Sequence, residues 1–437
     1  MKAVTPQKGN LLCPVCSAEN FAELVSFGEQ PLSAHLLASP EEQVLLHEGR
    51  YVYCRNCRFI RQAEFVPADL QYARYEYFSG DLLPAYAKDL ARRICQEVIP
   101  VTSGAVIEIG SNDGGFLQLL KDRGISCLLG IEPSEVLASH ANSRGLETLT
   151  GFFEALPVDQ ILKERKWNSG LIVARFVLEH VTDLEAFLRK MVSLAHGGTR
   201  MLIEVPDVDF ILERAIFTGF WDQHANYFNL HTLQRLAAGH GLEIYQYEYD
   251  YNRNERILRA WLRLADYPKS FSYPPTPLSA LKGFPRAVSQ KLGDIRTYCR
   301  SKHEEGRRLF LYGASHTPAN IVNYSGIGKF LQCALDGDER KAGKYLPGSK
   351  LKVVSVNRLA DDLPDYCLIA ALGSEDRIVS RHADYLRRGG AFVRLFPRIE
   401  AVESGSAMTP PVSKPLGLSE SRRAGNGPTS GRVIPQR

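Results

Sequence analysis

The stretch "SGAVIEIGSNDGGFLQLLKDRGISCLLGIEPSEVLASHANSRG" (103–145) decides the fold. It contains an apolar strand, a glycine-rich turn, an amphipathic helix and a second apolar strand that ends in an acid, which is the order of a βαβ unit. Further apolar strands are predicted at 169–181, 198–206 and 242–251. We therefore predict an α/β fold with a doubly wound, Rossmann-like sheet, in which ligands bind at the carboxyl ends of the strands.

The turn after the first strand differs from the dinucleotide-binding pattern G-x-G-x-x-G. After Gly110 the next glycines are Gly114 and Gly115, so a pyrophosphate cradle is poorly supported. Glu132 ends the second strand, where an acid accepts hydrogen bonds from ribose hydroxyls, and Asp113 can meet a cationic amine. These features fit S-adenosylmethionine, whereas a generic α/β turn, with Glu132 capping the next helix, is the alternative. The residues that we predict to bind this cofactor are Glu108, Gly110, Asn112, Asp113, Glu132, Pro133 and Arg175.

Two C-x-x-C pairs, "CPVC" (13–16) and "CRNC" (54–57), stand apart from the other five cysteines, which occur singly. Four thiolates delivered by two tight turns match the tetrahedral geometry of a structural zinc site. Four sulfurs leave no open coordination position for catalysis. We therefore predict that Zn²⁺ binds here, and the alternative is two unrelated pairs. The predicted metal ligands are Cys13, Cys16, Cys54 and Cys57.

Two histidine-containing stretches, "ARFVLEHVTD" (174–183) and "FWDQHANYF" (220–228), follow predicted strands. Both fall on the carboxyl edge of the sheet, where ligands bind in this fold. We therefore expect His180 and His224 to face one pocket, where an unperturbed histidine is partly neutral at pH 7 and can act as a general base. The alternative for each is a satisfied core histidine.

The composition excludes several classes of protein. At 437 residues the chain is long enough for two or three domains. The balance of 53 basic against 49 acidic residues, a net charge of +4, does not indicate a nucleic-acid partner. No run of about 18 apolar residues is present, and no apolar signal segment opens the chain, so we expect a cytoplasmic protein without a membrane partner.

With these features in order, the chain resembles the zinc-containing, S-adenosylmethionine-dependent sugar C-methyltransferases, which methylate C3 of nucleotide-linked 4-keto deoxysugars. The resemblance implies zinc in the N-terminal domain, S-adenosylmethionine in the middle and substrate between the middle and C-terminal domains. It is carried by the two cysteine pairs and by "EYFSG" (76–80), "EIGSNDGGF" (108–116), "GIEPS" (130–134), "VLEHVTD" (177–183), "YGASHTPANIVNYSGI" (312–327) and "DGDERKAGKYLPG" (336–348).

The catalytic segment of that family departs from this chain. The family has Tyr-His-Glu-His followed by x-x-Tyr-Phe, whereas here the segment starts Trp221-Asp222-Gln223-His224. Glutamine cannot act as a base and tryptophan cannot replace the proton chemistry of a phenol, so by elimination His224 is the predicted principal base. The other catalytic candidates are His180 and Tyr77, which match family positions near the substrate, the retained Tyr227, and Asp222, which either orients a histidine or is solvated.

Four parts of the chain are expected from changes in pattern. The repeat of strand, glycine, helix and strand at 307–348 has only Gly313 in its turn, which favours a substrate-associated role over a second cofactor site. The expected parts are a zinc-binding domain (1–70), a class I methyltransferase domain (71–255), a smaller Rossmann-like α/β domain with a helical connector (256–400) and a disordered tail (401–437).

The predicted function is S-adenosylmethionine-dependent methylation of a nucleotide-linked deoxysugar or a related polar metabolite, with a small-molecule substrate as partner. Because the catalytic segment is altered, O-methylation of a hydroxyl, which needs one base, is the first alternative. A non-catalytic binding homologue is the second, and a nucleic-acid methyltransferase the third. The retained cofactor residues argue against the second, and the absence of a basic stripe argues against the third.

Overall fold

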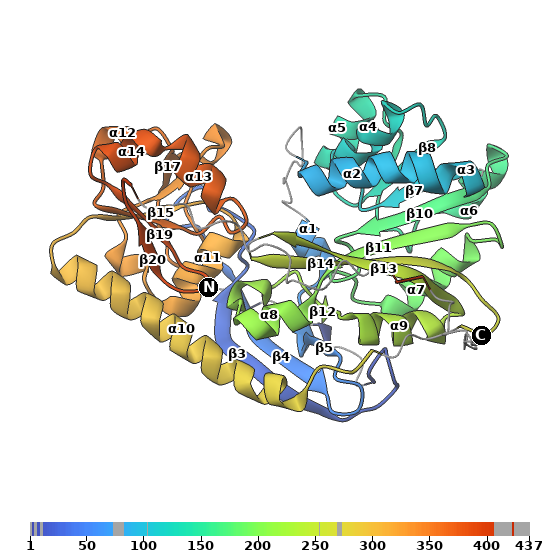
Figure 1. The fold of residues 1–437 in the computed structure, drawn as a ribbon, viewed down its shortest axis with the longest axis horizontal. Helices are drawn as coiled ribbons and strands as arrows, with labels where there is room; N and C mark the ends of the chain where they lie inside the picture. Colours follow the sequence, from blue (N-terminus) through green and yellow to red (C-terminus); the bar gives the residue numbers. More distant parts are fainter. Residues whose placement is uncertain are drawn as a thin grey trace, which may run out of the picture.

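The structure of the protein is a computed structural model, in which two α/β units are joined by a long helix and a smaller sheet (Figure 1). None of the helices in the described part of the chain has the length and apolar character needed to cross a lipid bilayer. The predicted site residue Tyr77 and most of the tail predicted to be disordered lie outside the described residues. The residues described are 2–3, 7–8, 12–72, 83–102, 104–252, 254–268, 273–405 and 422–423.

The central sheet has the order β21-β13-β14-β11-β10-β7-β8-β9. Strands β7 to β11 are paired in parallel, whereas β14 runs antiparallel between β11 and β13. The predicted doubly wound sheet is confirmed, and it takes in β14, which lies beyond the boundary expected at residue 255. The strands are β7 (Ala105–Ile109), β8 (Leu128–Glu132), β9 (Thr148–Thr150), β10 (Ser169–Arg175), β11 (Arg200–Pro206), β13 (Leu242–Asn252), β14 (Glu255–Leu264) and β21 (Arg422–Arg423).

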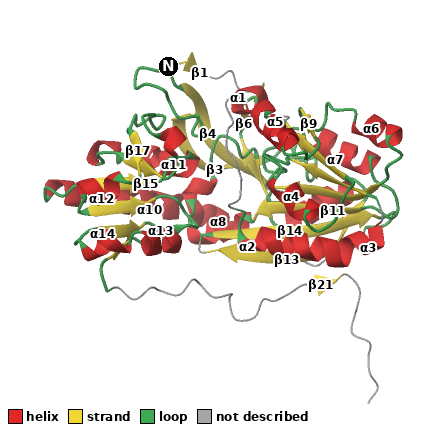
Figure 2. Ribbon diagram, turned by 90° about the horizontal axis from the view of Figure 1, so that it is seen from above, coloured by secondary structure: helices red, strands yellow, loops and turns green. Residues whose placement is uncertain are grey.

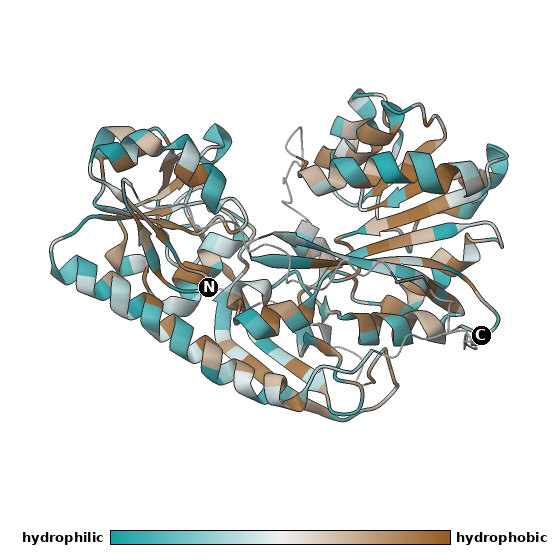
Figure 3. Ribbon diagram, in the orientation of Figure 1, coloured by the Kyte–Doolittle hydropathy of each residue, from teal (hydrophilic) through white to brown (hydrophobic). Residues whose placement is uncertain are grey.

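Helices cover both faces of this sheet because alternate side chains of each strand point to opposite sides. Val106 and Leu171 pack with residues of α2 and α4, whereas Ile107 and Ile172 pack with residues of α7 and α9. Strands β7 and β10 are accordingly buried along almost their whole length and mostly apolar (Figure 3). The helices of this unit are α2 (Ala85–Arg93), α3 (Ile99–Thr102), α4 (Gly115–Lys121), α5 (Glu135–Ser143), α6 (Val158–Glu164), α7 (Leu184–Ser193), α8 (Val208–Arg214) and α9 (Leu230–Gly239).

A second sheet forms around the N-terminal residues and lies between the two α/β units (Figure 2). Its order is β1-β4-β5-β12, with β3 paired to β4. Strand β12 comes from the predicted catalytic segment, so this segment completes the sheet of the N-terminal domain. The strands of this region are β1 (Lys2–Ala3), β3 (Phe21–Pro31), β4 (Leu45–Cys54), β5 (Ile60–Gln62) and β12 (Asn226–Tyr227), and β2 (Gln7–Lys8) pairs with β6 (Glu64–Phe65) beside the short helix α1 (Ala68–Tyr72).

The third sheet has the order β17-β16-β15-β18-β19-β20, and its first five strands are parallel. The repeat at 307–348 therefore forms the α/β unit that its pattern predicts, and α10 (Leu278–Glu304) is the expected helical connector. The strands are β15 (Leu309–Tyr312), β16 (Ala334–Asp336), β17 (Val353–Ser355), β18 (Tyr366–Ile369), β19 (Ala391–Arg394) and β20 (Glu400–Val402), with helices α11 (His316–Ser325), α12 (Arg358–Asp362), α13 (Glu375–Arg381) and α14 (Ala383–Arg387).

One hydrophobic core joins the three parts of the molecule. It contains Tyr51 of the N-terminal sheet, Phe220 of the predicted catalytic segment, Phe284 of α10 and Leu311 of β15. The ring of Phe220 lies 5.0 Å from that of Tyr51 and 5.1 Å from that of Phe284, measured between centroids. The predicted catalytic segment is therefore anchored in the core where all three parts meet.

Candidate active site and metal centre

A cavity of about 1010 Å³ lies between the carboxyl edge of the central sheet and the C-terminal α/β unit. The turn after β7, the end of β8 and the end of β10 form one wall, and the loop after β16 and helix α13 form another. The cavity thus joins the predicted cofactor turn to a second domain. The predicted cofactor residues that line it are Glu108, Gly110, Asn112, Glu132, Pro133 and Arg175.

Gly110 makes the cofactor turn sterically possible. Its φ is +70°, and a Cβ at this position would lie 2.4 Å from Cγ2 of Val177. That distance is below any normal carbon contact, so a side chain here would displace the loop after β10. Glycine thereby lets the two loops at the cavity wall approach one another.

Glu132 is a buried carboxylate that organises the same turn. Its Oε2 accepts a hydrogen bond from the backbone N–H of Asn112 and its Oε1 one from that of Ser134, both at 2.9 Å. Burial raises the pKa of Glu132, and these two hydrogen bonds oppose that shift. Each carboxylate oxygen has a second lone pair, so the group can still accept hydrogen bonds from a ligand in the cavity.

Asp113 does not lie where the sequence analysis expected a partner for a cationic amine. Its Oδ1 accepts a hydrogen bond from the backbone N–H of Gly115 at 3.2 Å, at the start of α4. Asp113 is buried and is not among the described residues that line the cavity. The geometry is that of a helix-capping carboxylate, which satisfies an amide of the first turn.

Glu108 is the acid that faces the cavity instead. Its Oε1 lies 4.0 Å from Nη1 of Arg175, but Arg175 is engaged more closely by Glu204, whose Oε2 lies 2.5 Å from the Arg175 Nε. Oε2 of Glu108 has no hydrogen-bond partner in the part of the chain that is described. Burial raises the pKa of Glu108 to about 8, against the attraction of Arg175. A cationic ligand group would favour its ionised form.

His180 is brought to the cavity by a sharp turn after β10. The predicted strand at 169–181 ends early, at Arg175, because Phe176 has a φ of +54°. The Nδ1 of His180 lies 2.9 Å from the backbone carbonyl of Gln223, so Nδ1 carries the proton and Nε2 keeps a free lone pair. Burial lowers the pKa of His180 to about 4. This ring is therefore neutral at pH 7.

His224 lies behind His180, with 4.9 Å between the ring centroids. Burial, and the neighbouring His180 and His316, lower the pKa of His224 well below its usual value, although a hydrogen bond to the Gly219 carbonyl opposes this. His180 and Gln223 line the described cavity, whereas His224 is not among its lining residues. The expectation that both histidines face one pocket is met for His180, which lines the cavity, and not for His224, whose ring lies against that of His180.

Asp222 and Tyr227 are held in the protein interior. Oδ1 of Asp222 accepts hydrogen bonds from the backbone N–H, at 3.1 Å, and the hydroxyl of Ser33. The negative charge of Asp222 opposes the lowering of the His180 pKa by burial. The Tyr227 ring stacks on Phe220, with centroids 4.5 Å apart, and Tyr227 is not among the described residues of the cavity wall. Neither side chain reaches this cavity, so their predicted catalytic roles stay predictions.

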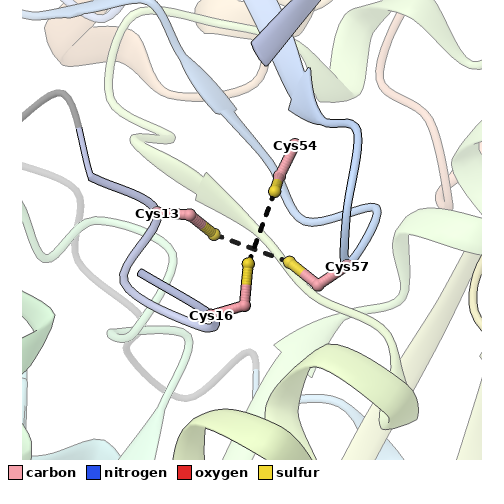
Figure 4. A group of neighbouring side chains, drawn as sticks. All are labelled: Cys13, Cys16, Cys54 and Cys57. Atoms are coloured by element: carbon pink, nitrogen blue, oxygen red, sulfur yellow. Dashed lines mark hydrogen bonds between the residues drawn. The ribbon is translucent and has the colours of Figure 1, made fainter. Parts of the chain in front are cut away.

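The two C-x-x-C pairs come together as the sequence predicts (Figure 4). Sγ of Cys13 lies 3.5 Å from Sγ of Cys57, Sγ of Cys16 lies 3.5 Å from Sγ of Cys54, and all four sulfurs are within 4.8 Å of one another. A tetrahedral site with Zn–S distances of about 2.3 Å requires sulfurs about 3.8 Å apart. The cluster therefore fits a tetrahedral metal, and four sulfurs close its coordination shell.

The sequence analysis missed the residues that the C-terminal unit contributes. The end of β16 and the loop after it add two acidic and then two basic side chains to the cavity, and one face of α13 adds two arginines. His316, the first residue of α11, stacks on Trp221 with 3.8 Å between ring centroids and 16° between planes. The charged residues at 336–341, directly after a predicted strand, were the sequence feature that could have identified this loop as part of the site. The charged residues are Asp336, Asp338, Arg340, Lys341, Arg377 and Arg381.

Comparison with known proteins agrees with this architecture. Residues 82–247 match a methyltransferase domain, and residues 276–397 match the C-methyltransferase C-terminal domain. The protein is an S-adenosylmethionine-dependent methyltransferase. It is similar to the C-methyltransferase NovU of Streptomyces niveus, with 26% identity over 413 residues, which cover 91% of this chain and 98% of NovU. The resemblance to C-methyltransferases is thereby confirmed over most of the chain.

Solved methyltransferases are more distant. The CcbJ methyltransferase of Streptomyces caelestis is 14% identical and covers 44% of this chain and 94% of its own, with a TM-score of 0.33. Magnesium protoporphyrin IX methyltransferase of Synechocystis PCC 6803 is 13% identical and covers 41% of this chain and 83% of its own, with a TM-score of 0.32. The assignment of the fold therefore rests on the strand order of the central sheet.

Proposed function

We propose that the enzyme transfers a methyl group to a carbon next to the ketone of a nucleotide-linked deoxysugar. One observation carries this proposal: a single cavity contains both the cofactor turn and the basic residues of the C-terminal unit. The similarity to NovU, which is named as a C-methyltransferase, supports methylation at carbon. The cavity is large enough for a cofactor and a second polar ligand together.

The residues present fit S-adenosylmethionine. Glu132 is placed to accept hydrogen bonds from the ribose hydroxyls, and Glu108, in place of Asp113, to meet the cationic amine. Gly110 and Asn112 provide backbone at close approach. When bound, the cofactor supplies an electrophilic methyl group, and its sulfur keeps the electron pair of the broken carbon–sulfur bond. The buried Glu108 carboxyl, which lacks a hydrogen-bond partner at Oε2 among the described residues, is the feature that best matches a missing cation.

The nucleotide part of the substrate would bind at the C-terminal unit. Lys341, Arg377 and Arg381 line the cavity on the side opposite the cofactor turn. Phosphate groups are bound in proteins mainly by such side chains, with arginine providing paired donors. A diphosphate held there would direct the sugar toward His180. The acidic neighbours Asp336 and Asp338 pair with Lys341 and Arg340, which fixes the loop.

His224 is proposed as the general base, with His180 beside it. Methylation next to a ketone requires removal of a carbon-bound proton, and the electron pair of that C–H bond passes to the ketone oxygen as the enolate forms. Both rings donate one N–H to a backbone carbonyl, of Gln223 or Gly219, so each keeps one free lone pair. That is the protonation state of a general base. The enolate carbon then takes the methyl group.

The four cysteine sulfurs are proposed to bind one structural Zn²⁺. Their spacing and their closed tetrahedral arrangement support this role. Zinc here would hold together the turns at 13–16 and 54–57 without taking part in methyl transfer.

Methylation of a hydroxyl is the second candidate, favoured by Gln223, which cannot serve as a second base in the altered segment. The deciding experiment uses methyl-labelled S-adenosylmethionine, a nucleotide-linked 4-keto-6-deoxysugar and NMR of the product. We expect a new carbon-bound methyl group and loss of the proton next to the ketone. A methyl group on oxygen would select the second candidate, and transfer to neither position would contradict the proposed substrate class.

A further inference from the structure

A buried acid lies beside the two histidines without a described partner. Glu179 is 2% exposed, and neither of its carboxylate oxygens has a hydrogen-bond partner among the described residues. One of its oxygens and one ring nitrogen each of His180 and His224 all lie within 4.8 Å of one another. Burying a carboxyl group without a partner is unfavourable, so such a group calls for a functional explanation.

The position of Glu179 is fixed by Asn226. The backbone N–H of Asn226 donates to the Glu179 carbonyl at 3.0 Å, and its side-chain amide donates to the carbonyl of Val181 at 2.6 Å. Asn226 is itself two residues after His224, on the strand that joins the N-terminal sheet. The turn that carries Glu179 and the segment that carries His224 are therefore locked together.

We propose that Glu179 is a positioning residue for the base, and that its carboxylate stabilises the imidazolium that forms at His224. This inference rests on the proposed role of His224. Gln223 cannot supply this charge because its side chain is a neutral amide. A base backed by a buried carboxylate is the arrangement by which many enzymes make a histidine effective.

Burial, and to a smaller extent the neighbouring charges, determine the pH at which Glu179 ionises. His180 and His224 face it from the two joined segments, and the acids Glu204 of β11 and Glu255 of β14 act on it from the sheet. Burial, with a smaller effect of these two acids, raises the pKa of Glu179 to about 8. As the pH rises, Glu179 releases its proton to solvent. His224 then takes the substrate proton beside a carboxylate, and no charge is left unbalanced within the pair.

The first test needs no substrate. Protein with ¹³C-labelled histidine rings is titrated by NMR between about pH 6.5 and 9.5, and we expect the His180 and His224 signals to shift with a midpoint near pH 8. The shift should be absent in Glu179→Gln. Glu108→Gln is the matched control, because burial raises the pKa of Glu108 to about 8 as well. The shift of the histidine signals should remain in this variant. The same step in Glu179→Gln would overturn the inference.

The second test measures turnover. In wild-type enzyme kcat should rise with pH around the same midpoint, whereas Glu179→Gln should lose this rise and about 10- to 100-fold of kcat at pH 8.5, with unchanged affinity for the cofactor. If no sugar nucleotide is methylated, the proposed function fails, and the NMR titration still decides the role of Glu179. If Glu179→Gln does not fold, Glu179→Asp replaces it. Its shorter side chain should move the midpoint, and an unmoved midpoint would overturn the inference.

The same three side chains are also of the types that bind a transition metal. Titration of the zinc-containing protein with Co²⁺ separates this alternative from the positioning role. One bound equivalent of Co²⁺ that is lost in Glu179→Gln would overturn the positioning role. We expect no Co²⁺ to bind at these three side chains.

Discussion

The side-chain amide of Gln62 donates a hydrogen bond to the backbone carbonyl of Trp221 at 3.0 Å. Gln62 ends β5, the strand that follows the second cysteine pair, and it also donates to the carbonyl of Asp222 at 3.1 Å. Strand β5 in addition pairs with β12. The N-terminal domain therefore holds the predicted catalytic segment by both backbone and side-chain hydrogen bonds.

Substitution Gln62→Ala should lower turnover although Gln62 is remote from the cofactor turn. Loss of two buried hydrogen bonds should lower the free energy of unfolding by about 1–3 kcal/mol. A displacement of about 1 Å at the segment should lower kcat by up to about 100-fold, with cofactor affinity unchanged. Thermal unfolding, calorimetry and a methyl-transfer assay test this. The control is Gln290→Ala, whose exposed amide bonds Asp294 on the same helix. Normal turnover in a less stable Gln62→Ala would contradict the positioning role.

Purified protein should contain about one equivalent of zinc, and its removal should unfold the N-terminal domain. Because β5 follows the metal cluster directly, we expect Cys54→Ser to lose the metal and also most of the turnover. Elemental analysis and circular dichroism provide the measurement. Cys127→Ser, which lies outside the cluster, should retain the metal. A metal-free protein with an unchanged fold and activity would rule out the structural zinc.

The local part of the site could be predicted from the sequence because it depends on short-range geometry. Gly110 and Glu132 belong to one βαβ unit, whose strand ends and turn are set by neighbouring residues. The role of Asp113 was predicted less well. Whether its carboxylate faces a ligand or accepts hydrogen bonds from the first amides of α4 depends on the direction of the side chain. Sequence spacing does not determine that direction.

The long-range part of the site was not predictable by the same reasoning. Strand β12 has two residues and pairs with β5 more than 160 residues earlier, and such a short strand has no periodicity to read. Glu179 was overlooked for a related reason. It stands next to His180 in sequence, but its burial and its approach to His224 follow from the clamp by Asn226.

Substitution Glu132→Ala should weaken binding of S-adenosylmethionine by about 1.5–3 kcal/mol, or about 10- to 150-fold in Kd, the range for a charge-assisted hydrogen bond. The loss includes the hydrogen bonds that Glu132 accepts from the backbone of the turn. Calorimetry measures it directly. Glu135→Ala, an exposed acid at the start of α5, is the control and should bind normally. Equal affinity in Glu132→Ala would reject the ribose assignment.

The partly buried His316 should make stability depend on pH. Burial lowers its pKa to about 4, so below about pH 6.5 the unfolded chain binds a proton that the folded chain does not. The free energy of unfolding should therefore fall on acidification by about 1.4 kcal/mol per pH unit for this group. His316→Gln should lack that contribution. On going from pH 6.5 to pH 5, the free energy of unfolding of His316→Gln, relative to that of wild type, should therefore rise by about 2 kcal/mol. Urea unfolding at the two pH values tests this, with the exposed His140→Gln as control. A constant difference between His316→Gln and wild type would show that His316 is not held neutral.

The last prediction separates the two histidines of the site. His224 is the only side chain of Trp221-Asp222-Gln223-His224 that can act as a base near neutral pH, because Asp222 is bound by Ser33 and neither tryptophan nor glutamine accepts a proton. We expect His224→Ala to lower kcat by about 10²–10⁴, the range for a general base, with little change in cofactor affinity. His180→Ala should lower kcat less. If His180, which lines the cavity, were the base instead, the order of the two effects would reverse. Restoring the family residues, Trp221→Tyr with Gln223→Glu, should not raise turnover on the native substrate, because the change replaces the Trp221 ring that is stacked on His316. Single-turnover methyl transfer on these variants gives the order, and a fully active His224→Ala would place the base elsewhere.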